Sequence, residues 1–274
     1  MESTLALIGF GEAGSTFARA ANWRGMAHAF DIDPTRRPLM EECGITACNS
    51  AEDALQGADV VLSLVTADSA ALVAQDYAPF LKSGALFCDM NSIAPQTKQA
   101  NARAVNEAGG RYVDIAVMAP VDPTALNVPL LIAGPDADEA EQRLNALGFA
   151  KTRITGADIG RASSIKMIRS VMVKGLEALT WECAAAADEA GVFDEVMTSL
   201  DASEKGWPWS RRVAYNRERM TTHGVRRAAE MEESAKTLDG FSVEPVMTRG
   251  TVIRQRQAAA KTPAKNSNER NETR

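Results

Sequence analysis

The chain has 274 residues, of which 45% are hydrophobic and 24% charged, a composition typical of one large or two medium globular domains. Its net charge is −6. This charge argues against nucleic acid as a general partner, because phosphate binding requires a basic surface. No apolar run is long enough to cross a bilayer, so the sequence predicts a protein without a membrane partner.

The cysteines and the first residues bear on location. The sequence holds four cysteines, Cys43, Cys48, Cys88 and Cys183, and their spacing lacks the pairs typical of zinc ligands. We therefore expect reduced thiols and no metal site. The chain begins Met1-Glu2 and continues directly into an apolar run, without the features of a signal peptide. These observations predict a cytoplasmic protein.

A glycine-rich turn follows the apolar run Leu5-Ala6-Leu7-Ile8. It reads Gly9-Phe10-Gly11-Glu12-Ala13-Gly14 and precedes a helical pattern, which is the context of a dinucleotide-binding turn. Gly9 permits the tight turn, Gly11 lets the backbone approach a pyrophosphate, and Gly14 lets the helix lie close to the strand. We expect the amides of this helix to receive the phosphates.

An acidic residue ends the second apolar segment. Asp31 follows Ala27-His28-Ala29-Phe30, a little short of the offset of roughly 20 residues expected for the carboxylate that accepts hydrogen bonds from the adenosine ribose. Such a carboxylate favours NAD and repels the 2′-phosphate of NADP. Arg36 and Arg37 follow closely and offer the alternative of a phosphate site, or of a solvated helical turn. The pattern predicts NAD, with NADP as the alternative.

Short apolar runs alternate with helical stretches in the first half of the chain, which predicts parallel strands joined by crossover helices. The predicted strands are 4–10, 27–32, 59–65, 85–89, 112–118 and 128–133. The second half is predicted to be helical over 162–190, 193–200, 209–221, 223–238 and 245–260. The predicted fold is therefore α/β, a Rossmann-type doubly wound sheet over 1–157 followed by an all-helical domain over 158–260, with a flexible tail at 261–274. Val65 and Thr66, where a parallel strand ends, are expected near the nicotinamide ribose.

The first long helix of the second half has two faces. Ile168, Met172, Gly175, Leu176 and Leu179 form an apolar stripe at helical spacing, which predicts a buried face. Ser163, Lys166 and Ser170 fall on another face, where the lysine is able to face a cleft. From spacing alone, a solvated surface lysine is the alternative.

Two further motifs give the chain a family resemblance. Asp89-Met90-Asn91-Ser92-Ile93-Ala94-Pro95 and Gly160-Arg161-Ala162-Ser163-Ser164-Ile165-Lys166-Met167 follow the glycine turn in this order. Over about residues 4 to 180 the chain resembles the β-hydroxyacid dehydrogenase family, which includes 3-hydroxyisobutyrate and 6-phosphogluconate dehydrogenases. The helical segment from Trp207 through His223 to Glu232 resembles that of a subgroup with a C-terminal domain of unknown function.

The resemblance implies an NAD(P)-dependent dehydrogenase acting on the CH–OH group of a small hydroxy acid or related alcohol. Lys166 would take the hydroxyl proton, while Asn91 and Ser92 would position the substrate. The backbone at Met118 and Ala119 would form the opposite wall, with Ser163 beside it. His223, predicted to head a helix, would add a polar contact from the helical domain, its alternative being a surface position.

Two departures from the family pattern put the substrate in doubt. Where most members have an aspartate, a Pro-Val and a Ser-Gly-Gly, this chain has Asp114-Ile115-Ala116-Val117-Met118-Ala119-Pro120. Ser170 stands where the family carries a substrate-orienting asparagine. Alternative functions are an imine reductase, which usually lacks this lysine, and a non-catalytic NAD-binding protein. The apolar helix of the second half, together with Trp207 and Trp209, also predicts a homodimer or higher homo-oligomer.

Overall fold

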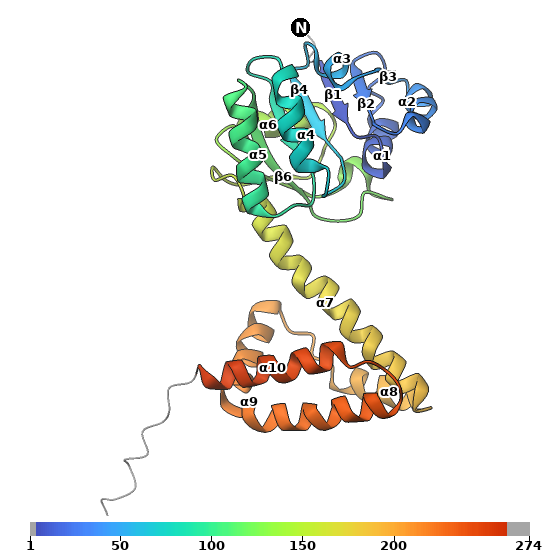
Figure 1. The fold of residues 1–274 in the computed structure, drawn as a ribbon, viewed down its shortest axis with the longest axis vertical. Coiled ribbons are helices and arrows are strands. Elements are labelled where there is room, and N and C mark those ends of the chain that lie inside the picture. The colour runs from blue at the N-terminus through green and yellow to red at the C-terminus, as the bar shows by residue number, and fades with distance from the viewer. Residues whose placement is uncertain (1–3, 262–274) are drawn as a thin grey trace, which may run out of the picture. The chain divides into compact units, whose positions relative to one another are not determined.

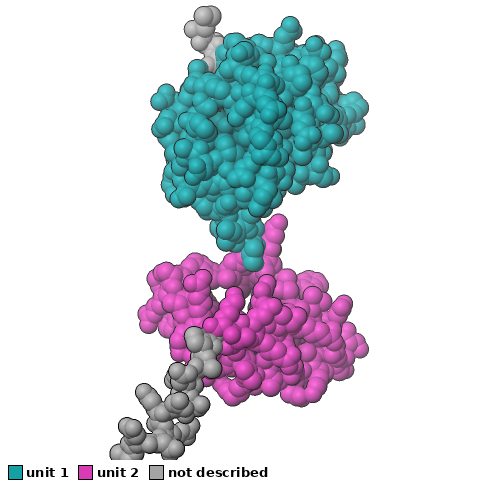
Figure 2. All heavy atoms as spheres, turned by 60° about the vertical axis from the view of Figure 1, so that its left-hand side comes forward, with its two compact units in different colours: residues 1–171 teal, residues 172–274 magenta. Residues whose placement is uncertain are grey.

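The computed structural model describes residues 4–261, and these form two compact units, unit 1 up to Val171 and unit 2 from Met172 onward (Figure 2). The predicted boundary between 157 and 158 lies shortly before the helix that spans both units, and the domain assignment stays a prediction. The predicted tail lies outside the described residues, except for Lys261. Within residues 4–261, no helix is long and apolar enough to span a membrane.

Unit 1 is built on one eight-stranded sheet with the strand order β3-β2-β1-β4-β5-β6-β7-β8. The strands are β1 Leu5–Ile8, β2 Ala27–Phe30, β3 Thr46–Ala47, β4 Val60–Ser63, β5 Leu86–Asp89, β6 Arg111–Val117, β7 Leu130–Ala133 and β8 Thr152–Gly156. Every residue of β1, β4 and β5 is buried, because parallel strands covered on both faces need continuous apolar runs. The strand order, which runs outward from β1 in both directions, is that of a doubly wound sheet, as predicted.

Helices cover both faces of this sheet (Figure 1). They are α1 Glu12–Ala21, α2 Arg37–Glu42, α3 Ala51–Leu55, α4 Ala70–Tyr77, α5 Pro95–Glu107 and α6 Ala137–Ala146. Phe17 of α1 and Leu144 of α6 belong to one buried cluster. Leu55 of α3 and Val105 of α5 belong to a second buried cluster. The two clusters hold the sheet rigid between its helical layers.

One strand pair corrects the prediction of a wholly parallel sheet. β7 runs antiparallel to β6, with Val117 opposite Leu130. Residues 118–129 between them contain only the short 3₁₀ turn Ala125–Asn127 and no crossover helix, which a parallel connection requires. The strands β3 and β8 were not predicted, because the first has two residues and the second carries exposed and polar positions.

The helices that follow the sheet are α7 Arg161–Glu189, α8 Phe193–Ser203, α9 Trp209–Gly240 and α10 Val246–Ala260. The prediction of two helices over 209–238 is wrong, because α9 is continuous through Gly224. A Cβ at Gly224 would lie 2.4 Å from the carbonyl oxygen of Gln255 in α10. The glycine therefore permits a close helix contact and does not end the helix.

Candidate active site

The glycine turn between β1 and α1 has the geometry that a bound pyrophosphate requires. Gly9 has φ of +93°, and a Cβ there would lie 2.7 Å from the carbonyl oxygen of Leu64. A Cβ at Gly14 would lie 2.7 Å from the carbonyl oxygen of Gly9, whereas a Cβ at Gly11 would meet nothing within 4 Å. Gly9 and Gly14 are thus required by packing, while Gly11 borders open space in which a ligand can approach the backbone.

Asp31 follows β2 and closes this turn. Its Oδ2 accepts a hydrogen bond of 2.6 Å from the amide of Phe10, and its Oδ1 accepts one of 2.9 Å from the amide of Asp33. Each carboxylate oxygen has two lone pairs, so both keep capacity to accept from ribose hydroxyls. The half-buried carboxylate therefore supports the turn and remains able to bind a sugar.

A cavity of about 230 Å³ lies in front of Asp31, and we call it the Asp31 cavity. Its lining includes Gly9, Gly11, Asp31, Asp33, Arg36, Leu64, Val65, Thr66 and Tyr77. Apart from Tyr77 of α4, these residues follow the carboxyl ends of β1, β2 and β4. Between β1 and β4 the strand order reverses, which is where open α/β sheets bind their ligands.

A second cavity, of about 450 Å³, shares Leu64 and Val65 with the first, and we call it the Lys166 cavity. Its lining includes Glu12, Ala13, Met90, Asn91, Ser92, Val117, Ala119, Pro120 and Lys166. The two cavities therefore adjoin across the end of β4. Together they offer one continuous set of walls from Asp31 to Lys166 for an extended ligand.

The half-buried Lys166 stands in the first turns of α7. Its ammonium nitrogen donates a hydrogen bond of 2.5 Å to the hydroxyl oxygen of Ser92, which follows β5. Both residues line the same cavity, so the two motifs that carry the family resemblance meet at one place. The ammonium group and the hydroxyl thus lie side by side on the cavity wall, where the lysine is able to exchange a proton with a substrate bound in the cavity.

Asn91 contributes an unusual polar group to this cavity. Its Nδ2 donates to the hydroxyl of Ser63 at 2.9 Å and to Oδ1 of Asp89 at 2.8 Å. Its Oδ1 is buried and has no hydrogen-bond partner among the described residues. An unpaired buried acceptor costs free energy, so this atom favours a ligand that brings a donor.

A buried ion network lies behind these side chains. Lys98 of α5, fully buried, has its ammonium nitrogen 3.0 Å from Oδ1 of Asp89 and 3.6 Å from Oδ1 of Asp114. Oδ2 of Asp89 accepts a hydrogen bond of 2.5 Å from the hydroxyl of Tyr112, whose pKa lies well above its ordinary value because of burial and the neighbouring carboxylate. The network fixes the end of β5, and with it Asn91 and Ser92.

Asp114 connects the same network to α7. Its Oδ2 accepts hydrogen bonds from the amides of Gly160 and Ser163 at 3.0 and 3.1 Å. The hydroxyl of Ser163 lies 3.1 Å from the same oxygen. The carboxylate therefore holds the N-terminal turn of α7 against β6, one turn before Lys166.

The structure does not bring every predicted residue to the cavity wall. Met118 packs against Ala162 and its neighbours, while Val117 and Ala119 on either side line the cavity. Ser163 is buried against Asp114 and is therefore engaged in holding the helix. Ser170 does not line the Lys166 cavity. His223 of unit 2 is exposed and lies within α9, so the expectation that it heads a helix is wrong, while its contact with the substrate stays a prediction.

Sequence reasoning missed the buried network. Lys98 and Asn101 were not singled out, although both occupy the face of α5 that also carries Ala102 and Val105. A lysine on an apolar helix face, next to strands that end in aspartate, is the sequence signal from which this network could have been predicted.

No group of histidine, cysteine or carboxylate side chains within 4–261 is arranged to hold a metal ion.

The residues present fit a nicotinamide dinucleotide. The open space at Gly11, the absence of a side-chain cap on α1, and the two adjoining cavities match the pyrophosphate and the two nucleoside halves. A comparison with known protein families also indicates NAD binding. Residues 4–153 match the model of the NAD binding domain of 6-phosphogluconate dehydrogenase, and residues 187–258 match a domain of unknown function, DUF1932.

The chain belongs to the β-hydroxyacid dehydrogenase family, in the subgroup with this helical C-terminal domain. The match to the NAD binding domain covers more than half of the chain. The family is one of oxidoreductases, so the protein is an NAD(P)-binding member with a fold similar to that of 3-hydroxyacid dehydrogenases.

Individual proteins similar to this chain include characterised and uncharacterised ones. A conserved hypothetical protein from Sinorhizobium meliloti 1021 is 37% identical, with 97% of this chain and 91% of that chain covered and a TM-score of 0.63. The NAD-dependent L-serine dehydrogenase of Pseudomonas aeruginosa is 25% identical over 223 residues, 77% of this chain and 73% of that protein. An imine reductase variant from Myxococcus stipitatus in complex with NAD⁺ is 20% identical, with 95% and 94% covered and a TM-score of 0.75, a likeness that shows the fold alone.

Proposed function

We propose that the protein transfers hydride between a nicotinamide cofactor and the hydroxyl-bearing carbon of a small hydroxy acid or related alcohol. The observation that carries this proposal is the hydrogen bond of 2.5 Å between Lys166 and Ser92 on the wall of the Lys166 cavity. Because this cavity adjoins the Asp31 cavity at Val65, a dinucleotide lying along both would bring its nicotinamide to these two side chains.

Each side chain has a distinct role in this proposal. A nicotinamide bound along the two cavities would supply the chemistry of hydride transfer. Lys166 takes the proton of the substrate hydroxyl during oxidation and returns it during reduction, as a general base and acid. Ser92 orients the ammonium group and the substrate oxygen, and the unpaired Oδ1 of Asn91 accepts from a substrate or cofactor donor. Orienting the reacting groups in this way lowers the activation barrier by roughly several kcal/mol, as in oriented intramolecular reactions.

We infer that the cofactor is NAD, with NADP as the less favoured alternative. Asp31 supports this, because its carboxylate lines the cavity expected to hold the adenosine ribose and would repel a 2′-phosphate. Arg36 lines the same cavity but already pairs with Asp33 at 3.4 Å. Its charge is therefore partly neutralised before any ligand binds.

The substrate class is inferred from the wall opposite Lys166. In the segment where the family has Pro-Val and Ser-Gly-Gly, the chain presents Val117, Ala119 and Pro120 to the cavity, and Pro120 has no amide hydrogen to donate. This wall suits an alcohol or hydroxy acid with an apolar part. The likeness to an L-serine dehydrogenase supports oxidation of a CH–OH group as the reaction type.

We further propose that the active unit is a homodimer or a higher homo-oligomer. The stripe of α7 that the sequence predicts to be buried is exposed in the single chain, Ile168 at 72% and Met172, Leu176 and Leu179 each above 40%. A second copy is the partner that would cover such a stripe.

The predicted cytoplasmic location likewise stays a proposal, and all four cysteines are free thiols.

A turnover screen tests the proposed reaction. Purified protein is incubated with NAD or NADP and a panel of β-hydroxy acids, L-serine, and aryl and sugar-derived alcohols, and formation of the reduced cofactor is followed by absorbance. The same protein with reduced cofactor is offered cyclic imines. Turnover of an alcohol supports the proposal. Reduction of imines alone would support the imine reductase alternative, and cofactor binding without any turnover would support a non-catalytic role.

A further inference from the structure

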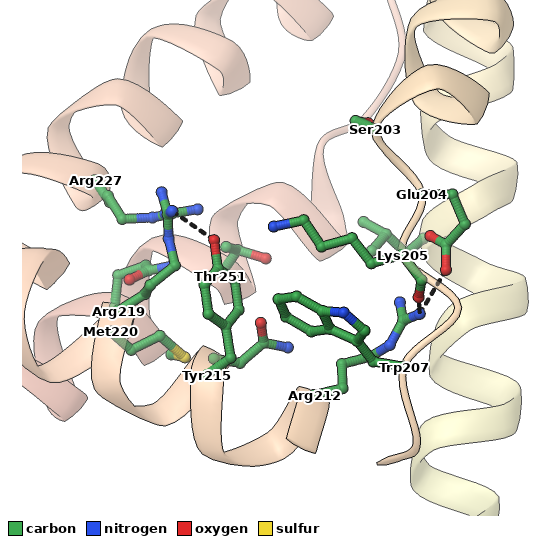
Figure 3. A pocket seen from close by; sticks show the side chains of 13 residues that line it. Ser203, Glu204, Lys205, Trp207, Arg212, Tyr215, Arg219, Met220, Arg227 and Thr251 are labelled. Carbon is green, nitrogen blue, oxygen red and sulfur yellow. Dashed lines mark hydrogen bonds and ion pairs between the residues drawn. The ribbon is translucent and has the colours of Figure 1, made fainter. Parts of the chain in front are cut away.

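Unit 2 contains a cavity that the proposed reaction does not use, and we call it the Arg227 cavity (Figure 3). Its volume is about 640 Å³. It lies between α9, α10, Leu179 of α7 and the segment that joins α8 to α9, and all the residues that line it belong to unit 2. The fold of this unit alone therefore forms the cavity.

The charges around this cavity are strongly unbalanced. Four cationic side chains line it, those of Lys205, Arg212, Arg219 and Arg227, against one carboxylate, that of Glu204. Arg212 pairs with Glu204 at 2.5 Å and so neutralises it. Within residues 4–261, none of the other three cations pairs with a carboxylate. A chain with a net charge of −6 thus places three uncompensated cations around one cavity.

Aromatic rings line the same cavity. The ammonium nitrogen of Lys205 lies 4.5 Å from the ring centroid of Trp207 and 4.8 Å from that of Tyr215. The two rings pack edge to face at 5.1 Å. Figure 3 shows Arg219 and Arg227 on the side of Tyr215, and Lys205 extending toward them from the other side. The cavity therefore combines a flat apolar surface with cationic donors.

The hydroxyl of Tyr215 and the amide of Gln255 are two further polar groups at this cavity. Arg219 donates a hydrogen bond of 2.7 Å to the hydroxyl of Tyr215, which lowers the pKa of Tyr215 below its ordinary value, with the charge of Lys205 acting in the same direction. Gln255 is more than nine-tenths buried and lines the cavity, and its Oε1 has no hydrogen-bond partner among the described residues. This unpaired acceptor points to a ligand that brings a hydrogen-bond donor, such as a hydroxyl group, beside its anionic group.

We propose that the Arg227 cavity is a binding site for a small organic anion, a carboxylate or phosphate carried on a ring or apolar chain. The guanidinium groups of Arg219 and Arg227 offer planar forks that match either oxyanion. Binding an anion there relieves the repulsion among the three cations, and the rings of Trp207 and Tyr215 cover the apolar part. The proposal concerns binding and is independent of the proposed reaction.

Calorimetric titration of the full chain tests this site. Phenyl phosphate, benzoate and inorganic phosphate serve as probes, in the presence of saturating NAD so that the phosphate-binding turn of unit 1 is filled. One phenyl phosphate or benzoate is expected to bind per chain, and inorganic phosphate more weakly. The stronger of the two organic probes identifies the oxyanion. Absence of binding by both, or equal binding of inorganic phosphate, overturns the proposal.

Matched variants place the bound probe. Arg227→Met is expected to weaken binding roughly tenfold to a hundredfold, as for a lost charged hydrogen bond. Arg226→Met is the control, because the neighbouring Arg226 is exposed and pairs with Glu230. Trp207→Phe should weaken phenyl phosphate and leave inorganic phosphate unchanged. If Arg227→Met and Arg226→Met bind alike, with unchanged circular dichroism, the probe lies elsewhere and the proposal is wrong.

Discussion

The ammonium nitrogen of Lys98 lies 3.0 Å from Oδ1 of Asp89, and both side chains are fully buried. A buried ion pair contributes little net stability compared with apolar packing, but it is specific in geometry. Here it fixes the end of β5, from which Asn91 and Ser92 project into the Lys166 cavity. Through Asp114, the same lysine is connected to the start of α7, which carries Lys166. The pair therefore sets the distance between the two halves of the candidate site.

Removing this lysine should destabilise unit 1 strongly. Lys98→Met leaves the carboxylates of Asp89 and Asp114 buried without their cation, so we expect a loss of about 3–5 kcal/mol in the free energy of unfolding. Denaturant unfolding followed by circular dichroism measures it. Lys82→Met is the control, because Lys82 pairs with Asp59 on the exposed surface, where such pairs contribute about 0–1 kcal/mol. Similar losses in both variants would contradict the role given to Lys98.

Cofactor preference should depend on Asp31. The native protein is expected to bind NAD several-fold or more tightly than NADP, and Asp31→Ser should reduce this ratio, because the repulsion of the 2′-phosphate is removed. The ratio is the quantity to measure, by titration of both cofactors, since losing the hydrogen bond from Phe10 weakens the turn for both. Glu41→Gln, an exposed carboxylate change, should leave the ratio unaltered. Equal binding of NADP by the native protein would make Arg36 the controlling residue.

Local sequence patterns predict part of this fold and of the candidate site, whereas features that depend on tertiary contacts were not predictable. The glycine turn and Asp31 follow local rules of strand, turn and charge, so their place in the fold was predictable. The direction of β7 was not predictable, because it depends on whether residues 118–129 form a direct connection or a crossover between the two strands. Lys98 was missed because its importance comes from two aspartates on different strands. The exposure of Ile168 was also missed, since helical spacing shows an apolar face but not what covers it.

Glu182 should stabilise unit 2 in a pH-dependent manner. Its buried carboxylate accepts hydrogen bonds from the amides of Met247 and Thr248, 2.7 and 2.8 Å long, at the start of α10. Burial raises the pKa of Glu182, but the hydrogen bonds from Thr248 and the backbone outweigh it and the pKa is lowered. The stabilisation is therefore present at neutral pH and is lost as pH falls through the range where glutamate titrates.

Hydrogen exchange at these two amides tests this role. Glu182→Ala should reduce the protection at Met247 and Thr248 by about 1–3 kcal/mol at neutral pH. The difference from the native protein should shrink in acid, when the native carboxylate is protonated. Glu177→Ala, on an exposed position of the same helix, is the control. Protection that is independent of pH in the native protein would exclude the carboxylate as the cap.

The oligomeric state should depend on the exposed stripe of α7. Changing Ile168 and Leu176 together to aspartate places two charges on this stripe, and a charge buried without a partner is costly. We expect sedimentation to show a dimer or higher oligomer for the native protein and a smaller species for the double variant. Lys174→Asp changes charge on the same helix, on the side away from the stripe, and should leave assembly unchanged. A native protein that sediments as an active monomer would refute the proposal.

Replacing Lys166 tests whether the chain is an enzyme with the proposed mechanism. Lys166→Ala should leave NAD binding nearly intact, because the backbone of the glycine turn would hold the pyrophosphate and Asp31 the adenosine ribose, and neither contact needs the lysine. Turnover should fall roughly 10²–10⁴-fold, as expected for a lost general base.

Three further variants separate proton transfer from charge, from helix stability and from the orientation of the ammonium group. Lys166→Arg should not restore the rate, because a guanidinium stays protonated at any working pH and cannot take the substrate proton. Lys174→Ala, an exposed position further along α7, should turn over like the native protein. Ser92→Ala should lower turnover less than Lys166→Ala, because it removes the group that orients the ammonium but leaves the base in place. If Lys166→Ala keeps a rate within a few-fold of the native one on the true substrate, the lysine is a surface residue and the proposed mechanism is wrong.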